Sequence, residues 1–233
     1  MMAEDVERTL EMVAEIGYHE VEFAGYFERT PRELRATLDG LGLTAPATHL
    51  GLNILRDGLD EAVETAATLG HRYLVLPSLP APDHDSLDDY RRIGDEMNRI
   101  GEVCHASGLR FAYHNHEFEF ERMDGRIPFD VLLEETDPEL VQIELDLFWI
   151  IDGGQDPLAY FEAHPGRFHL CHVKDRLADG TMVEVGAGEI DFAAMFAQAA
   201  NAGLEHYFVE HDQPSDPGAS VRESYRHLSR LTW

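Results

Sequence analysis

FHLCHVKD, the stretch at residues 168–175, combines the pattern of a buried strand with a group of reactive side chains at its end. Its apolar members are Phe168, Leu170 and Val173. The polar members at its C-terminal end are His172, Lys174 and Asp175. In parallel α/β sheets that end of a strand carries the ligand-binding loops. The stretch therefore predicts both a fold class and the place of a site.

Lys174 is the only lysine of the chain, since every other residue among the 18 basic ones is arginine. A single lysine between a histidine and an aspartate at a strand end favours a chemical role for its amine. The alternative is that composition removed the other lysines and that this one forms an ion pair. Its candidate partners are Asp146, Asp175 and Glu210.

The acidic composition narrows the possible functions. The chain has 233 residues and a formal net charge of −27, from 45 acidic and 18 basic residues. Such a surface repels nucleic-acid phosphates and anionic membranes. No apolar run approaches the roughly 18 residues of a membrane span, and MMAEDVERTLEMV reads as an amphipathic helix rather than a signal peptide. The two cysteines, Cys104 and Cys171, have no metal-type spacing, so we expect a cytoplasmic protein.

Helical and strand patterns alternate along the whole chain. Strands are expected at 20–24, 45–50, 72–77, 109–116, 141–146, 168–173 and 207–210. Helices are expected at 3–16, 31–39, 57–69, 86–107, 128–136, 156–164, 190–202 and 220–231, with 118–126 and 181–189 as loops. This alternation predicts a parallel sheet with crossover helices, in one TIM-type (β/α) barrel domain over residues 1–233.

The strand count departs from that of a closed barrel. Eight strands close a TIM barrel, and the pattern supplies seven because it opens on a helix. The lacking strand would stand between the strands at 20–24 and 207–210. We expect a gap there, either open or filled by a neighbouring molecule, which makes a homo-oligomer a further expectation.

Polar side chains gather where the expected strands end, at the rim that carries the active site of a TIM barrel. They are His49, His114, His116, Asp146, His172, Lys174 and Glu210. Because residues i and i+2 share one face of a strand, His172 shares a face with Lys174, and Glu144 with Asp146.

Four rim residues would form a metal site if they point inward, and they are His114, Asp146, His172 and Glu210. Carboxylate oxygens and imidazole nitrogens suit a divalent ion such as Mn²⁺, Co²⁺, Zn²⁺ or Mg²⁺. One histidine alone would be an ordinary hydrogen-bonded residue, so the prediction rests on repetition at successive strand ends. An ion beside acid/base groups favours abstraction of a proton α to a carbonyl, through an enediolate.

Seven motifs together resemble the xylose-isomerase-like TIM barrels. They are GYHEVEF (17–23), THL (48–50), YHNHEFEF (113–120), ELDLFW (144–149), HVKD (172–175), VGAGEIDF (185–192) and FVEHD (208–212). The group contains sugar-phosphate isomerases/epimerases, ketose 3-epimerases, inosose dehydratases and dehydroshikimate dehydratases. The resemblance covers nearly the whole chain in the expected order, and it does not specify a substrate.

The resemblance implies four metal ligands from four strand ends. Asp146, His172 and Glu210 match three of the family's ligand positions, and His114 stands where ketose epimerases have a glutamate. This departure leaves His116, Glu117 and Glu119 as alternative fourth ligands. It also argues against a direct transfer of the two-glutamate epimerase mechanism, because one acid/base group would become an imidazole.

The resemblance also implies roles around the ion. His116 and Lys174 match substrate-contacting positions of the dehydratases, while Trp149 replaces a frequent histidine. Glu22 and His49 match rim positions, and we expect these two residues and Trp149 to bind substrate. The candidate catalytic residues are Glu210, Lys174, His116 and His114.

The function predicted first is a metal-dependent isomerase or epimerase of a sugar or keto-sugar. A lyase that dehydrates a keto-sugar or cyclitol at the same site is the alternative, and a non-catalytic, truncated barrel is another. A DNA-repair endonuclease on the same barrel conflicts with the net charge of −27. The expected partner is therefore a small sugar or polyol, with neither nucleic acid nor membrane involved.

Overall fold

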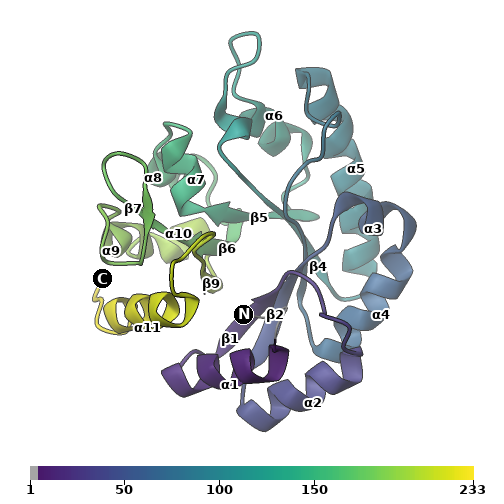
Figure 1. The fold of residues 1–233 in the computed structure, drawn as a ribbon. Coiled ribbons are helices and arrows are strands. Elements are labelled where there is room, and N and C mark those ends of the chain that lie inside the picture. Colours follow the sequence, from purple (N-terminus) through teal and green to yellow (C-terminus); the bar gives the residue numbers. More distant parts are fainter. Residues whose placement is uncertain (1–4) are drawn as a thin grey trace.

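The computed structural model describes residues 5–233 and contains one parallel sheet rolled into a nearly closed barrel, with helices outside it (Figure 1). Seven strands follow one another around the barrel in chain order. They are β1 (Glu20–Phe23), β2 (Thr44–His49), β3 (Tyr73–Leu76), β4 (Arg110–His114), β5 (Val141–Asp146), β6 (Phe168–Val173) and β9 (His206–Val209). The predicted TIM-type barrel with seven strands is confirmed.

Helices connect successive strands and cover the outside of the sheet. They are α1 (Val6–Ile16), α2 (Pro31–Leu41), α3 (Leu52–Asp57), α4 (Leu59–Leu69), α5 (Leu87–Ala106), α6 (Pro128–Glu135), α7 (Leu147–Asp152), α8 (Pro157–Ala163), α9 (Phe192–Phe196), α10 (Ala199–Ala202) and α11 (Pro217–Leu228). Local sequence explains their ends: Thr30 and Glu33 form a capping box before α2, and Gly42 ends that helix in the left-handed conformation. Within residues 5–233, every helix is too short or too polar to cross a membrane.

Several boundaries differ from the predicted ones. The helix expected at 57–69 is α4, and α3 before it was not predicted. The helix expected at 190–202 is divided into α9 and α10. The loop expected at 181–189 contains β8 (Met182–Val183), which pairs with β7 (Asp175–Arg176). The loop expected at 118–126 contains a 3₁₀ turn at Phe118–Phe120. The expected helix start at residues 3–4 lies outside the described residues.

The barrel interior has an apolar layer below a polar one. The apolar layer consists of Ala47, Tyr73, Val75, Ala112, Leu170 and Phe208. Two residues further along β2, β4, β6 and β9 come His49, His114, His172 and Glu210. Because alternate residues of a strand share a face, the strands that bury the apolar layer also point these polar side chains inward.

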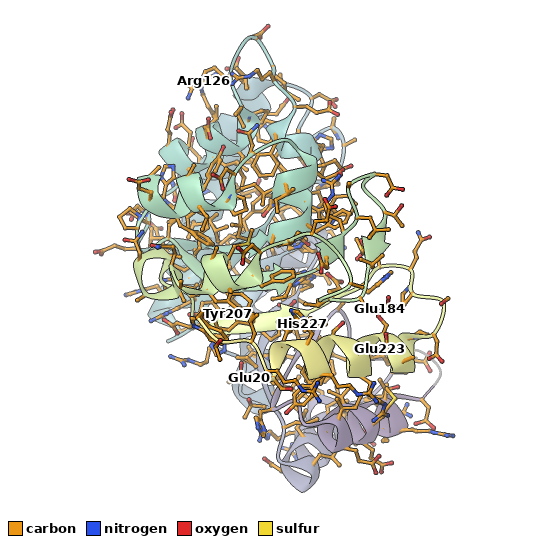
Figure 2. The ribbon with its side chains drawn as sticks, turned by 90° about the vertical axis from the view of Figure 1, so that its left-hand side faces the viewer. Glu20, Arg126, Glu184, Tyr207, Glu223 and His227 are labelled. Atoms are coloured by element: carbon orange, nitrogen blue, oxygen red, sulfur yellow. The ribbon has the colours of Figure 1, made fainter. Side chains whose placement is uncertain are left out.

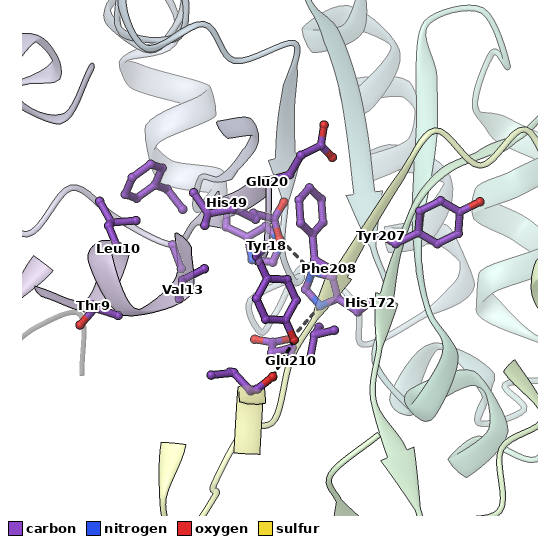
Figure 3. A pocket seen from close by; sticks show the side chains of 16 residues that line it. Thr9, Leu10, Val13, Tyr18, Glu20, His49, His172, Tyr207, Phe208 and Glu210 are labelled. Carbon is purple, nitrogen blue, oxygen red and sulfur yellow. Dashed lines mark hydrogen bonds and ion pairs between the residues drawn. The ribbon is translucent and has the colours of Figure 1, made fainter. Parts of the chain in front are cut away.

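The sheet begins at β1 and ends at β9, so the gap lies where the strand count placed it. Side chains, rather than a paired ladder, connect its two sides in the described part of the chain. Glu20 Oε2 of β1 lies 2.8 Å from His206 Nδ1 of β9, and Glu22 Oε2 of β1 lies 2.8 Å from His172 Nε2 of β6, the strand next to β9. A cavity of about 250 Å³ opens between the two strands, with Leu10 of α1 on its wall (Figure 3). We call this junction of β1 and β9 the seam.

Two helices cover the seam from outside. Helices α1 and α11 lie side by side across it; in Figure 2, α11 carries the labelled Glu223 and His227, and the purple α1 lies below it. The hydroxyl of Tyr18 donates a hydrogen bond to the Val221 carbonyl at 2.9 Å, and its ring lies 4.9 Å from that of Tyr225. The two helices therefore hold the barrel together where backbone pairing is lacking.

The seam predicts an uneven pattern of amide hydrogen exchange. Strand β4 is paired on both sides, whereas β1 and β9 are each paired on one side. Amides of β1 and β9 that face the seam should exchange at least about tenfold faster than those of β4, because local opening breaks fewer bonds. Native-state exchange followed by NMR or mass spectrometry measures this. Equal protection of the three strands would contradict an open seam.

Candidate active site

Four side chains converge at the C-terminal rim of the barrel, as the sequence predicted. His114 Nε2 lies 3.2 Å from Asp146 Oδ2, and His172 Nδ1 lies 2.7 Å from Glu210 Oε2. One ligand atom of each of the four lies within 4.8 Å of those of the other three. We call these four residues the rim set. They come from β4, β5 and β6 and from the end of β9, so the parallel sheet brings them together.

The surrounding backbone orients two members of the rim set. His114 Nδ1–H donates to the carbonyl of Pro77 at 2.9 Å, which turns Nε2 toward Asp146. Asp146 Oδ1 accepts the backbone N–H groups of Phe148 and Trp149, both at 3.0 Å. Asp146 is thereby the N-cap of α7 and presents Oδ2 to the site. This helix was not predicted, although Asp before an apolar run is a helix-start signal.

Lys174 is buried among three carboxylates. Its Nζ lies 3.0 Å from Asp146 Oδ2, 2.7 Å from Glu210 Oε2 and 2.9 Å from Asp212 Oδ1. Burial alone would lower the pKa of Lys174, but the charges of Asp146 and Glu210 raise it above its usual value. The ammonium is therefore charged at neutral pH.

Two of the three expected ion-pair partners of Lys174 are confirmed, namely Asp146 and Glu210. Asp175, the third one proposed, is wrong as a partner because its carboxylate accepts the backbone N–H groups of Gly186, Gly188 and Ile190. Asp212, which the sequence did not single out as a partner, takes its place. Asp175 instead holds the loop that follows β8.

The rim groups shift each other's proton affinity. Burial would raise the pKa of Asp146, but a hydrogen bond with His114 and the charge of Lys174 lower it to about 2. Burial would also raise the pKa of Glu210, but the positive charges of His172 and Lys174 beside it lower that pKa below its usual value. Both carboxylates are ionised at neutral pH and can act as metal ligands.

His116 and Trp149 lie beside the rim set. The His116 ring centre is 4.9 Å from that of His114 and 5.9 Å from that of Trp149. Lys174 Nζ lies 5.7 Å from the centre of the Trp149 ring. Burial and the neighbouring His114 lower the pKa of His116 to about 4, so its imidazole is neutral at pH 7.

Glu119, one of the alternative fourth ligands, belongs to neither group of close ligand atoms and has other partners. Its carboxylate accepts the hydroxyl of Tyr113 and, at 2.9 Å, the backbone N–H of His116. Burial raises the pKa of Glu119 to about 7. His114, by contrast, places Nε2 against Asp146, so the geometry favours His114 as the fourth ligand over Glu119.

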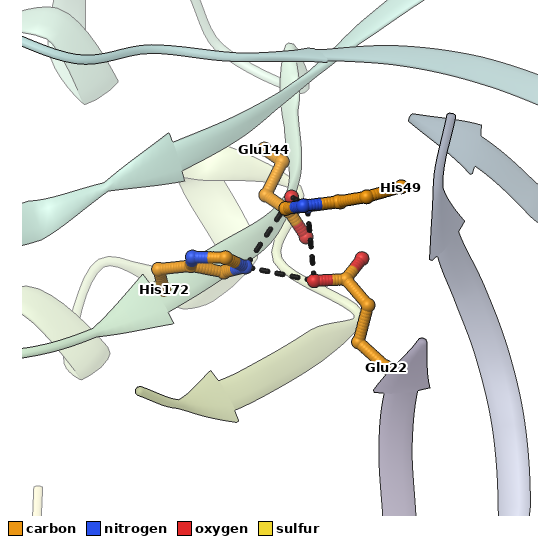
Figure 4. Close-up of side chains that lie close together, drawn as sticks. All are labelled: Glu22, His49, Glu144 and His172. Atoms are coloured by element: carbon orange, nitrogen blue, oxygen red, sulfur yellow. Dashed lines mark hydrogen bonds and ion pairs between the residues drawn. The ribbon is translucent and has the colours of Figure 1, made fainter. Parts of the chain in front are cut away.

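A second group of four lies below the rim and includes the predicted substrate ligands Glu22 and His49 (Figure 4). We call this group the inner ring; its members are Glu22, His49, Glu144 and His172, and it shares His172 with the rim set. His49 Nε2 lies 2.7 Å from Glu144 Oε2 and 3.1 Å from Glu22 Oε2. His172 Nε2 lies 2.8 Å from Glu22 Oε2 and 3.4 Å from Glu144 Oε2. Burial would lower the pKa of His49, but the two carboxylates raise it to about 9.

Glu144 is the member of the inner ring that received no role from the sequence. Its side chain is fully buried, in a strand whose six residues are all buried. The available signal was its spacing, because a residue two positions before Asp146 shares its inward face. Glu22, His49 and His172 line the seam cavity together with Glu210, so the inner ring and the rim border one space (Figure 3).

The donor chemistry of the rim set fits a divalent ion. Two carboxylate oxygens and two imidazole nitrogens match the ligands of Mn²⁺, Co²⁺ or Zn²⁺. The atoms lie close enough to share one ion, since all are within 4.8 Å of one another. Lys174 shares the oxygens of Asp146 and Glu210, so its charge is the main opposition to a cation there.

A parallel barrel with polar groups at the C-terminal rim defines the class of the TIM-barrel enzymes. Residues 10–231 match the xylose isomerase-like TIM barrel family, and the chain belongs to this family. An inosose dehydratase of Geobacillus kaustophilus is 23% identical over 264 aligned positions, which cover 96% of this chain and 85% of that protein. An inosose dehydratase of Salmonella typhimurium is 25% identical, covering 78% of this chain and 72% of that protein.

Solved structures have the same fold. A sugar phosphate isomerase/epimerase of Parabacteroides distasonis superposes with a TM-score of 0.84 at 28% identity, covering 97% of this chain and 88% of that one. An L-ribulose 3-epimerase shares the fold, with a TM-score of 0.75 at 16% identity, and covers 97% of this chain and 88% of its own. The chain is therefore an enzyme of a family with both isomerases/epimerases and dehydratases.

Lys174 should stabilise the metal-free protein, because it balances the charge of Asp146 and Glu210. Lys174→Met should lower the free energy of unfolding by about 2 kcal/mol, less than for a fully buried pair because Glu210 reaches solvent. Added Mn²⁺ should narrow the difference from the unsubstituted protein, since the ion would supply positive charge. Denaturant unfolding with and without Mn²⁺ measures both effects.

Arg91→Met is the matched control, because Arg91 pairs on the surface with Asp88 and, at 3.7 Å, with Glu135, and all three side chains are more than a third exposed. Loss of an exposed pair should change stability by less than about 1 kcal/mol. If the two variants lose the same stability, Lys174 contributes no more than an exposed ion pair.

Proposed function

We propose that this chain is a metal-dependent isomerase or epimerase that acts on a sugar or keto-sugar by moving a proton α to a carbonyl. The observation that carries the proposal is the convergence of the rim set beside Lys174 and neutral His116. Relatives named sugar phosphate isomerase/epimerase and L-ribulose 3-epimerase support it.

Dehydration of a keto-sugar or cyclitol is the second candidate. Relatives named inosose dehydratase support it about equally. Lys174 favours it as well, because a charged ammonium can donate a proton or hydrogen bond to a departing hydroxyl group. Both reactions begin with loss of a proton next to a carbonyl, so one site serves either proposal.

His114, Asp146, His172 and Glu210 would hold one divalent ion, which supplies Lewis-acid polarisation of the substrate carbonyl. His116 is neutral at pH 7, so one of its ring nitrogens can accept the α-proton. Its Nδ1 is available for this, because it has no hydrogen-bond partner among the described residues. Lys174 donates hydrogen bonds to a substrate oxygen from within its carboxylate cage.

The wall around these groups suits a small polyol. Trp149 offers an aromatic face beside Lys174, and His49 and Glu22 border the cavity below. An aromatic face packs against the C–H side of a sugar ring, while charged groups take its hydroxyls. Trp149, His49 and Glu22 therefore remain our proposed substrate-binding residues, with Glu22 and His49 at the bottom of the site.

Loss of a rim ligand should remove the ion. His172→Ala and Glu210→Gln should each lower the metal content of the purified protein from one divalent ion per chain to well below half. The physical reason is that His172→Ala removes one donor of four, while Glu210→Gln replaces an ionised carboxylate with a neutral amide, which is a weaker ligand for a divalent ion. Elemental analysis after dialysis against Mn²⁺ or Zn²⁺ provides the measurement.

His169→Ala serves as the control for this experiment. His169 lies on the same strand as His172 but contacts Tyr73 and Glu205 at the opposite end of the barrel. It should retain the ion. Full metal content in both His172→Ala and Glu210→Gln would refute the assignment of the rim set.

Lys174 should be needed for turnover rather than for metal binding. Lys174→Met keeps most of the stem volume and removes the amine, so kcat/KM should fall about 100-fold or more, equivalent to about 3 kcal/mol of transition-state stabilisation. The assay is a panel of keto-sugars and inososes with added Mn²⁺, followed by product analysis that separates epimers from dehydrated products. Unchanged kcat/KM with the ion bound would leave Lys174 as an ion-pair residue only.

A further inference from the structure

We propose that Glu22 and Glu144 are positioning residues for His172: they accept its Nε2–H inside the barrel and so direct Nδ1 toward the ion. This inference rests on the proposed metal site, and it gives Glu22 a second role beside the substrate contact proposed above and gives Glu144 its first role. The two ring nitrogens of His172 would then have different tasks, one facing the inner ring and the other facing the rim.

The polarity of the hydrogen bonds carries the argument. An ionised carboxylate can only accept a hydrogen bond, so a ring nitrogen that faces two carboxylates must carry the proton. His172 Nε2 is in this position, 2.8 Å from Glu22 Oε2 and 3.4 Å from Glu144 Oε2. Nδ1 faces Glu210 and Asp146 at 2.7 and 3.7 Å, so without an ion it carries a proton as well. A cation held by these two carboxylates would take the place of the Nδ1 proton, and a ring that keeps its proton on Nε2 then offers the lone pair of Nδ1 to the cation.

The inner ring also buries two carboxylates, which lowers the stability of the fold, so a contribution to stability does not explain why they are there. Glu22 and Glu144 are 8% and 0% exposed, and their Oε1 atoms have no hydrogen-bond partner within residues 5–233. Buried charges of this kind usually stabilise a fold less than apolar side chains of the same size would. Carboxylates behind a metal-binding histidine, by contrast, commonly fix its tautomer and strengthen it as a ligand.

His49 completes the arrangement by holding the two carboxylates in place. Its Nε2 faces Glu144 and Glu22 from the side opposite His172, with the two imidazole rings 5.3 Å apart and nearly parallel. Since Glu22 belongs to β1, the strand at the edge of the seam, the orientation of His172 also depends on where this edge strand lies.

The test compares Co²⁺ binding by the metal-free full chain and three variants: Glu22→Gln, Glu144→Gln and the control Glu20→Gln. Glutamine keeps the size of the side chain and removes its charge. We expect Glu22→Gln and Glu144→Gln to bind Co²⁺ about 10- to 100-fold more weakly and to shift the visible absorption bands of the bound ion. The shift of the bands is a readout that loss of stability alone would not produce.

Glu20→Gln is matched because it lies on the same strand as Glu22 and also loses a carboxylate–imidazole contact of 2.8 Å, to His206. His206 belongs to neither the rim set nor the inner ring, so Co²⁺ affinity and spectrum should stay at the wild-type values. If Glu144→Gln fails to fold, the ring ¹⁵N signals of His172 in the Co²⁺-free wild type and in its Zn²⁺ complex still test the idea. A proton on Nδ1 and none on Nε2 in the Zn²⁺ complex would overturn it.

The outcomes separate the two proposals. A wild-type protein that binds no Co²⁺ overturns the metal site and the positioning role with it. A wild-type protein that binds Co²⁺ while both Glu22→Gln and Glu144→Gln bind it with the same affinity and spectrum leaves the metal site intact and overturns the positioning role alone.

Discussion

The imidazole of His172 is the point on which the polar interior of this barrel depends. One ring nitrogen meets Glu210 at 2.7 Å at the rim, and the other meets Glu22 at 2.8 Å below it. Strands β1, β6 and β9 are thus linked through a single side chain, at the place where the sheet has no backbone pairing. His172 therefore both connects the two sides of the seam and belongs to the rim set.

Charge balance explains why this acidic chain can place so many carboxylates in its interior. The protein carries a formal charge of −27, yet its rim has Lys174 against three carboxylates, and its inner ring has two imidazoles against two carboxylates. The buried basic groups keep their protons where carboxylates surround them. His116, which has a histidine neighbour instead, stays neutral. One small volume therefore holds charged and neutral bases side by side.

The sequence predicted those features that repeat or alternate. Strand and helix periodicity located the seven strands, and counting them located the seam. The positions of polar residues at the expected strand ends were enough to group His114, Asp146, His172 and Glu210, because parallel strands end at one rim.

Features that depend on side-chain direction were not predictable in the same way. Helix α7 depends on the Asp146 carboxylate turning back to cap it, and Asp175 turns toward backbone amides instead of Lys174. The inner ring required knowing that Glu22 and Glu144, from strands far apart in sequence, reach the same point. Periodicity gives the face of a strand, but it does not give the depth at which two side chains meet.

The seam also sets the order in which the polar interior can be assembled as the chain is made. Glu22 and His172 are 150 positions apart in sequence, so their contact cannot form until most of the chain has left the ribosome. At about 5–20 residues per second, roughly 8–30 s of synthesis separate the two residues. During that time the edge of β1 lacks β9 beside it, and the Glu22 carboxylate lacks His172. The polar interior, and with it any cation bound there, belongs to the last stage of folding.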